Sequence, residues 1–92
     1  MRFEWDATKA SVNFLKHKVS FGEAVEVFYD PNALEEYNAA HSSSETRFSI
    51  IGLSSRRLLF VVFTEYNKQV RIISARKASK AERKFYEGRI IK

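Results

Sequence analysis

Arginine is the residue type in this sequence whose chemistry best suits a phosphodiester. Arg47, Arg71 and Arg76 lie in or next to the predicted strands of the C-terminal half. A guanidinium stays charged at any working pH and binds phosphate bidentately, so clustered arginines can bind RNA and stabilise charge on a phosphorane-like transition state. No metal ion or other cofactor is needed for this chemistry. Arg83 and Lys77 lie next to the same elements, so the sequence predicts cationic chemistry on RNA with these two residues and the three arginines as candidates.

Cleavage of RNA also needs groups that move protons. The nucleophile is the ribose 2′-hydroxyl, which the protein must orient and deprotonate while it protonates the departing 5′ oxygen. Glu45 or His41 is the candidate base, and Tyr86 or an arginine-polarised group is the candidate acid. Four basic residues at the predicted last helix are candidates for binding RNA: Lys77, Lys80, Arg83 and Lys84.

Simpler structural roles compete with these interpretations. Arg71 and Arg76 are five positions apart, so a regular strand would point them to opposite faces, and only one of them would be catalytic. Arg83 and Glu87 have the i, i+4 spacing of a surface ion pair on a helix. His17 is interpreted as a cation at a helix end or a packing residue rather than as a catalyst.

The sequence lacks the residues that several other kinds of catalytic site require. Cysteine is absent, which removes disulfides, thiolate metal ligands and a cysteine nucleophile together. Two histidines cannot form a three-histidine zinc site. Glu35, Glu36 and Glu45 are close to His41 in the sequence, but their spacing does not place two ligands on one helical face. The three glycines form neither a nucleophile elbow nor a phosphate-binding loop. We expect no metal site.

Charge is distributed unevenly along the chain. The net charge is +5, but residues 1–46 carry four basic and eight acidic side chains, whereas residues 47–92 carry twelve basic and three acidic ones. A surface this basic is attracted to a polyanion or to an acidic protein surface through long-range electrostatic steering. Charge alone does not choose between those two partners.

Size and hydropathy define the class of protein. With 92 residues, of which 45% are hydrophobic and 14% aromatic, the chain is expected to form one globular domain over 1–92. The longest apolar run, Leu58–Phe63, is far shorter than the roughly 20 residues of a membrane-spanning helix. No apolar signal-peptide stretch follows Met1. These features favour a soluble, cytoplasmic protein without a membrane partner.

The N-terminal third is predicted to contain a short strand and two helices. Alternating residues predict a strand at 2–5, and Asp6 is the N-cap of a helix over 7–17. Ser20 and Glu23 have capping-box spacing and open a second helix over 21–28, which Asp30-Pro31-Asn32 ends. The first helix is expected to bury one face, formed by Ala10, Phe14 and His17.

The rest of the chain is predicted to form strands and a last helix. A brief strand over 33–37 and an exposed loop over 38–44 precede strands at 46–54, 58–63 and 69–75. Since the connections are short, the last three strands form an antiparallel meander with the apolar strand 58–63 at its centre. Ser79 and Glu82 then open a helix to about residue 89, which is expected to bury Ala81 and Phe85.

These elements predict an α+β fold. An antiparallel β-sheet would pack against two N-terminal helices and one C-terminal helix, as a single layer pair of sheet and helices. Helix, three-stranded meander and helix is also the element order of double-stranded-RNA-binding modules. A non-catalytic RNA-binding module is therefore the alternative function, although the leading elements and the position of Arg71 within a strand argue against it.

The sequence resembles the BrnT family of toxins over residues 3–86. The N-terminal half of this resemblance lies in Phe3-Glu4-Trp5-Asp6, Lys9, Asn13, Lys16-His17-Lys18-Val19-Ser20-Phe21, Glu23-Ala24, Val27-Phe28 and Asp30-Pro31. The C-terminal half lies in His41, Glu45, Arg47, Ile51-Gly52-Leu53-Ser54, Leu58-Leu59, Glu82-Arg83, Tyr86 and the block Arg71-Ile72-Ile73-Ser74-Ala75-Arg76-Lys77-Ala78. The family commonly has glycine where Lys18 stands, a position that ends a helix.

The resemblance implies a toxin of a type II toxin–antitoxin module with a RelE-like fold, which inhibits translation by cleaving RNA. It implies a BrnA-type antitoxin with a ribbon-helix-helix DNA-binding part, and contact with operator DNA only through the toxin–antitoxin complex. In RelE-like enzymes a basic groove and an arginine near the end of the sheet carry the chemistry, which best matches Arg47, Arg71 and Arg76 here. Alternatively, the basic face is chiefly a docking surface for an acidic antitoxin segment.

Overall fold

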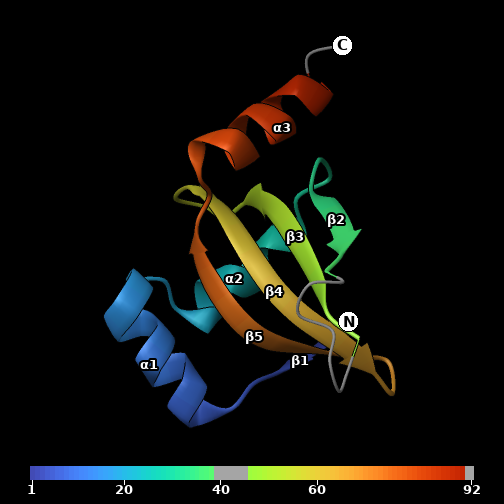
Figure 1. Ribbon diagram of the computed structural model, residues 1–92. Coiled ribbons are helices and arrows are strands. Elements are labelled where there is room, and N and C mark those ends of the chain that lie inside the picture. Colours follow the sequence, from blue (N-terminus) through green and yellow to red (C-terminus); the bar gives the residue numbers. More distant parts are fainter. Residues whose placement is uncertain (39–45, 91–92) are drawn as a thin grey trace.

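Five strands and three helices are present in the part of the chain that the structure, a computed structural model, describes: residues 1–38 and 46–90. Figure 1 shows α2 behind the sheet, α1 beside β5 and α3 at the upper end. In chain order the elements are β1 Arg2–Glu4, α1 Ala7–His17, α2 Phe21–Val27, β2 Leu34–Tyr37, β3 Phe48–Leu53, β4 Leu58–Tyr66, β5 Gln69–Lys77 and α3 Lys80–Ile90. The predicted α+β class is confirmed.

The sheet has the strand order β1-β5-β4-β3-β2. β3, β4 and β5 form the predicted antiparallel meander, with the apolar β4 in the middle, and β2 adds to β3 in antiparallel pairing. β1, however, pairs with β5 in parallel, so the sheet is mixed and the prediction of an entirely antiparallel sheet is wrong in this strand. Strand periodicity carries no information on direction, which depends here on how the long connection returns the chain to the sheet.

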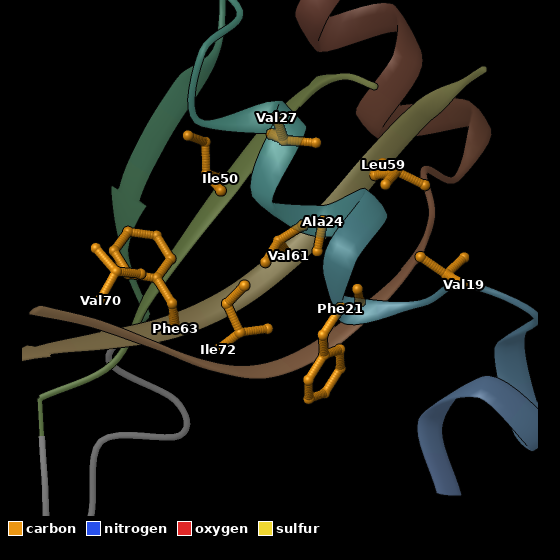
Figure 2. Packing of buried hydrophobic residues seen from close by; sticks show 11 residues of the cluster. Val19, Phe21, Ala24, Val27, Ile50, Leu59, Val61, Phe63, Val70 and Ile72 are labelled. Carbon is orange, nitrogen blue, oxygen red and sulfur yellow. The ribbon is translucent and has the colours of Figure 1, made fainter. Parts of the chain in front are cut away.

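α2 covers one face of the sheet and forms the main core. Phe21, Ala24 and Val27 are at most 2% exposed and pack in one cluster with Val61 and Phe63 of β4 (Figure 2). The sequence predicts an apolar stripe of Phe21, Ala24, Val25 and Phe28 on this helix. Val25 and Phe28 are only partly buried and pack against the cluster, whereas Val27 is fully buried. Close approach depends on Gly52 in β3, because a Cβ at this position would lie only 2.7 Å from a methyl carbon of Val27.

α1 packs through a polar residue rather than through its apolar ones. Phe14 is 49% exposed, so the expectation that it is buried is wrong, whereas Asn13 is 7% exposed. The Asn13 side-chain amide donates to the Ala75 carbonyl (2.8 Å) and accepts from the Ala75 N–H (3.1 Å). It therefore supplies hydrogen bonds that a neighbouring strand would otherwise give to β5, since β1 pairs only as far as Arg71.

The helix ends follow the predicted caps with one difference. The side chains of Asp6 and Ser20 cap α1 and α2, and α3 begins with a complete Ser79–Glu82 capping box. Glu23, in contrast, turns its carboxylate away from the cap. It accepts hydrogen bonds from Arg57 (2.8 and 3.0 Å) and from Ser54 (2.7 Å), which ties α2 to the turn between β3 and β4.

α3 packs on the opposite face of the sheet from α2, at one end only. Tyr86 is 3% exposed and clusters with Leu34, Ile51 and Leu58. Phe85 is 50% exposed, so the prediction that it lies on the buried face is wrong by one position. The rest of this face carries no helix among the described residues, and we call it the open face.

No described helix is both long and apolar enough to span a membrane.

Candidate functional site

Arg71 and Arg76 project from the same face of β5. Arg71 pairs with Thr64 and Arg76 with Phe60, and both partners lie on the open face of β4 because they are four positions apart. Between them, Val62 pairs with Ser74 and Phe63 pairs with Ile72, so Ile73 is an extra residue in β5. This β-bulge reverses the alternation, and the prediction that the two arginines face opposite sides is therefore wrong.

Arg76 is held flat on the open face. Its guanidinium carbon lies 4.3 Å from the centroid of the Phe60 ring, a cation–π arrangement. Its Nη1 and Nη2 donate to the two carboxylate oxygens of Glu82 at 2.8 and 2.9 Å, and Nη1 also donates to the Lys77 carbonyl at 3.1 Å. Burial opposes ionisation of Glu82, but the hydrogen bonds from Arg76 and Ser79 outweigh it and lower the Glu82 pKa.

One edge of the Arg76 guanidinium is still available. Glu82 occupies the end formed by the two Nη atoms, and three of the five N–H donors are used in hydrogen bonds within the described residues. The Nε–H and the second hydrogen of Nη2 form the side edge of the same plane. Such an edge binds a phosphate bidentately, so an anion can reach Arg76 without displacing Glu82.

A hollow of about 400 Å³ opens beside Arg76 on the open face. We call it the central hollow. Phe60 and Val62 of β4 form its apolar floor, and its polar lining is His17, Asn38, Ser74 and Arg76. These residues come from α1, the end of β2, and β5. A basic group beside small polar side chains suits a phosphodiester better than an apolar ligand.

His17 is the lining residue to which the sequence analysis gave only a structural role. It is the last residue of α1, it is half-buried, and it lines both the central hollow and a neighbouring side groove of about 290 Å³. Lys9 and Lys16 of α1 also line the side groove. The position of His17 between Lys16 and Lys18 is a basic run that is visible in the sequence. The sequence spacing does not predict, however, that the end of α1 lies beside β5.

Arg71 lies at the other end of the open face from Arg76. Its Nη1 donates to Glu4 of β1 at 2.9 Å, and the same Glu4 oxygen accepts a hydrogen bond from the Tyr66 hydroxyl. Tyr66 and Arg71 together lower the pKa of Glu4. The partners of Arg71 and Arg76 in β4 are four residues apart, or about 13 Å along a strand, so the two arginines suit different phosphates of one RNA strand rather than a single phosphate.

The remaining catalytic candidates from the sequence are placed differently. Arg47 is half-buried, precedes β3 directly, and accepts the Asn38 N–H at its backbone oxygen (2.8 Å). Asn38 lines the central hollow, whereas Arg47 does not belong to its lining. His41 and Glu45 lie outside the described residues.

Tyr86 occupies a structural position. Its hydroxyl donates to Asp30 at 2.5 Å, which ties α3 to the turn after α2. Burial and this hydrogen bond raise the pKa of Tyr86 to about 12. Both effects disfavour transfer of its proton to a substrate on the open face.

The candidate RNA-binding residues lie on the surface near α3. Lys77, Lys80 and Lys84 are exposed, and Arg83 forms the expected i, i+4 ion pair with Glu87 at 3.7 Å. A pair this long between exposed side chains restrains Arg83 little, and it leaves Arg83 accessible to a polyanion.

A third surface feature is apolar and lies away from the arginines. A groove of about 540 Å³ runs between α1 and the start of α2, and we call it the apolar groove. Trp5, Phe14, Leu15 and Phe21 contribute its apolar walls. Leu15 is 72% exposed and Trp5 40%, so these side chains offer apolar area that nothing in the described chain covers.

The chain matches a known protein family. A family model described as "Ribonuclease toxin, BrnT, of type II toxin-antitoxin system" matches residues 5–82. No curated protein matches the chain significantly. Among residues 1–38 and 46–90, no group of three or more acidic or histidine side chains is arranged to hold a metal ion.

Proposed function

The chain belongs to the BrnT family of ribonuclease toxins of type II toxin–antitoxin systems, and we propose that it cleaves RNA at the central hollow without a metal ion. Arg76 is the phosphate-binding residue of this proposal. The observation that carries it is the geometry of Arg76, whose guanidinium is stacked on Phe60, fixed by Glu82, and still offers two donors beside the hollow. A cation held in one orientation stabilises developing charge better than a mobile one.

The reaction uses the ribose of the substrate as nucleophile. The 2′ oxygen attacks phosphorus and loses its proton, the bond from phosphorus to the 5′ oxygen breaks, and the 5′ oxygen gains a proton. Charge accumulates on the non-bridging phosphate oxygens, where Arg76 acts. Arg47 and Arg71 bind other phosphates of the same strand, and Glu45 or His41 accepts the 2′ proton. The basic surface extends beyond the sheet through four residues near α3: Lys77, Lys80, Arg83 and Lys84.

Incubation of purified protein with labelled RNA in EDTA, with and without ribosomes, tests this proposal. We expect cleavage that EDTA does not abolish and that Arg76→Ala reduces strongly. Products ending in a 2′,3′-cyclic phosphate would identify the internal nucleophile. Binding of RNA without cleavage under every condition, together with normal growth on expression, would instead favour the non-catalytic RNA-binding module.

The partner of this toxin is a BrnA-type antitoxin, and the apolar groove is its docking site. Type II toxins are neutralised by a protein, and the groove exposes apolar area on α1. α1 contains Lys9, Lys16 and His17 but no acidic residue. An antitoxin segment with apolar side chains on one face and acidic ones beside them complements this surface.

The complex, rather than the toxin alone, is the species that contacts operator DNA. The antitoxin supplies a ribbon-helix-helix part, and the complex represses its own operon. Gel-shift titration of the operator with toxin, antitoxin and both together tests this. We expect the tightest shift with both proteins, whereas an equal shift by the toxin alone would contradict the proposal.

A further inference from the structure

His17 is positioned to take part in the reaction at the central hollow. His17 lines this hollow together with Arg76, although 59 positions separate the two residues in the sequence. Within residues 1–38 and 46–90, no hydrogen bond or ion pair of the ring is present. The imidazole is half-buried, so it is accessible to a ligand in the hollow and is not engaged by the described part of the protein.

The fold fixes His17 in this place by several contacts. Asn13, one helical turn earlier, bonds to Ala75 of β5 and also donates to the Val19 carbonyl at 3.0 Å. Immediately after His17, Lys18 adopts a left-handed conformation with φ of 59°, and its N–H bonds back to Phe14 at 2.8 Å. The end of α1 is therefore anchored on both sides of His17, next to the bulge of β5.

The departing 5′ oxygen of RNA needs a proton, and Tyr86 is poorly placed to give one. Tyr86 is buried against Asp30. We infer that His17 is the general acid of the ribonuclease. In this step the protonated imidazole gives its proton to the 5′ oxygen as the phosphorus–oxygen bond breaks, while Arg76 binds the non-bridging oxygens. Solvent then returns a proton to the ring. The inference rests on the proposed ribonuclease function and adds a residue to it.

The charged residues around His17 favour binding of an anionic substrate. Arg76 of β5 and Lys9 and Lys16 of α1 are the charged residues lining the two hollows that His17 borders, and no described Asp or Glu lines either one. The cations attract the phosphate to the imidazole. An acidic neighbour would instead bind the ring and compete with the substrate.

A sulfur-substituted substrate isolates the proton-transfer step. After the cleavage site of the wild-type protein has been mapped on a short RNA, the same RNA is made with sulfur in place of the 5′-bridging oxygen at that site. Thiols are far more acidic than alcohols, so a thiolate leaves without protonation. We expect His17→Asn to slow cleavage of the oxygen substrate on the order of 100-fold or more, as for loss of a general acid, and the sulfur substrate by less than about threefold.

Two further measurements keep the result interpretable. His17→Asn should retain the wild-type melting temperature, and Lys9→Gln, which removes a cation from α1 outside the central hollow, should affect both substrates equally. An equal loss of rate on both substrates in His17→Asn, or no loss on either, would overturn the assignment of His17. Failure of the wild-type protein to cleave either substrate would overturn the proposed ribonuclease function itself.

Discussion

Phe60 and Arg76 are cross-strand partners in β4 and β5, and the guanidinium of Arg76 stacks on the face of the Phe60 ring. A planar cation on an aromatic face, with a carboxylate at one end, has a single preferred orientation. Lysine reproduces the charge but neither the stacking plane nor the bidentate fork. The site therefore depends on arginine geometry and not only on positive charge.

Arg76→Lys should consequently lose most of the ribonuclease activity. We expect Arg76→Lys and Arg76→Ala each to cost about 3 kcal/mol of transition-state stabilisation, or roughly 100-fold in kcat/KM. Arg56→Ala is the matched control, since it removes one exposed arginine in the turn between β3 and β4, which has no part in the proposed site. Cleavage assays with equal concentrations of folded protein measure both effects. Near-wild-type activity in Arg76→Lys would show that charge alone suffices.

Tyr86→Phe should lower stability and leave catalysis unchanged. The substitution removes the hydrogen bond to Asp30, whose carboxylate also accepts from the backbone N–H groups of Asn32 and Leu53. We expect a loss of about 1–2 kcal/mol in the free energy of unfolding, measured by urea titration. If Tyr86→Phe abolished cleavage at unchanged stability, the catalytic role predicted from the sequence would be correct.

Acid should destabilise the protein in part through Glu23. Hydrogen bonds from Arg57 and Ser54 outweigh the effect of burial and lower the Glu23 pKa from its ordinary value of 4.5. A lowered pKa in the folded state means that this contribution is complete above about pH 4.5 and is lost as the pH falls through the folded value.

Glu23→Gln tests that contribution. The variant should be less stable at pH 7 by about 2 kcal/mol, because Arg57 loses its charged partner, and the difference from wild type should shrink below pH 4.5. Urea titrations at a series of pH values measure it. A difference that grows towards acid pH would contradict the assigned sign.

Lys18→Gly should stabilise the protein. Lys18 holds a φ of 59°, which glycine adopts without the clash of a Cβ. We expect a gain of about 0.5–1 kcal/mol. Lys16→Gly, two positions earlier inside α1, should instead cost about 1 kcal/mol. Thermal melts of the two variants should therefore shift in opposite directions.

Leu15→Glu should impair neutralisation by the antitoxin without affecting cleavage. Leu15 lines the apolar groove and is 72% exposed, so a charge there should leave the fold intact and repel an acidic partner. We expect at least a tenfold weaker complex by calorimetry. Leu53→Glu, at an exposed apolar residue outside the groove, is the control. Equal binding by wild type and Leu15→Glu would place the antitoxin elsewhere.

Much of the secondary structure followed from local chemistry. Asp6 and the Ser79–Glu82 pair begin helices because side-chain oxygens satisfy free N–H groups of the first turn. The unbroken apolar run of β4 predicted the central strand correctly. The coverage of both faces that such a run also predicts is only partial, because Phe60 and Val62 form the floor of the central hollow on the open face. The basic residues of the C-terminal half also mark the chain as a partner for an anion, because their charge is the same wherever the fold places them.

What the tertiary structure alone decided is which side chains share a surface. The bulge at Ile73 turns Arg71 and Arg76 to the same face, and no spacing rule reveals where a strand gains an extra residue. Tyr86 rather than Phe85 is buried because its hydroxyl reaches Asp30, which lies 56 positions away. His17 and Arg76 line one hollow for the same reason: hydrogen bonding within a helix or hairpin is local, whereas the approach of distant elements depends on how the whole chain packs.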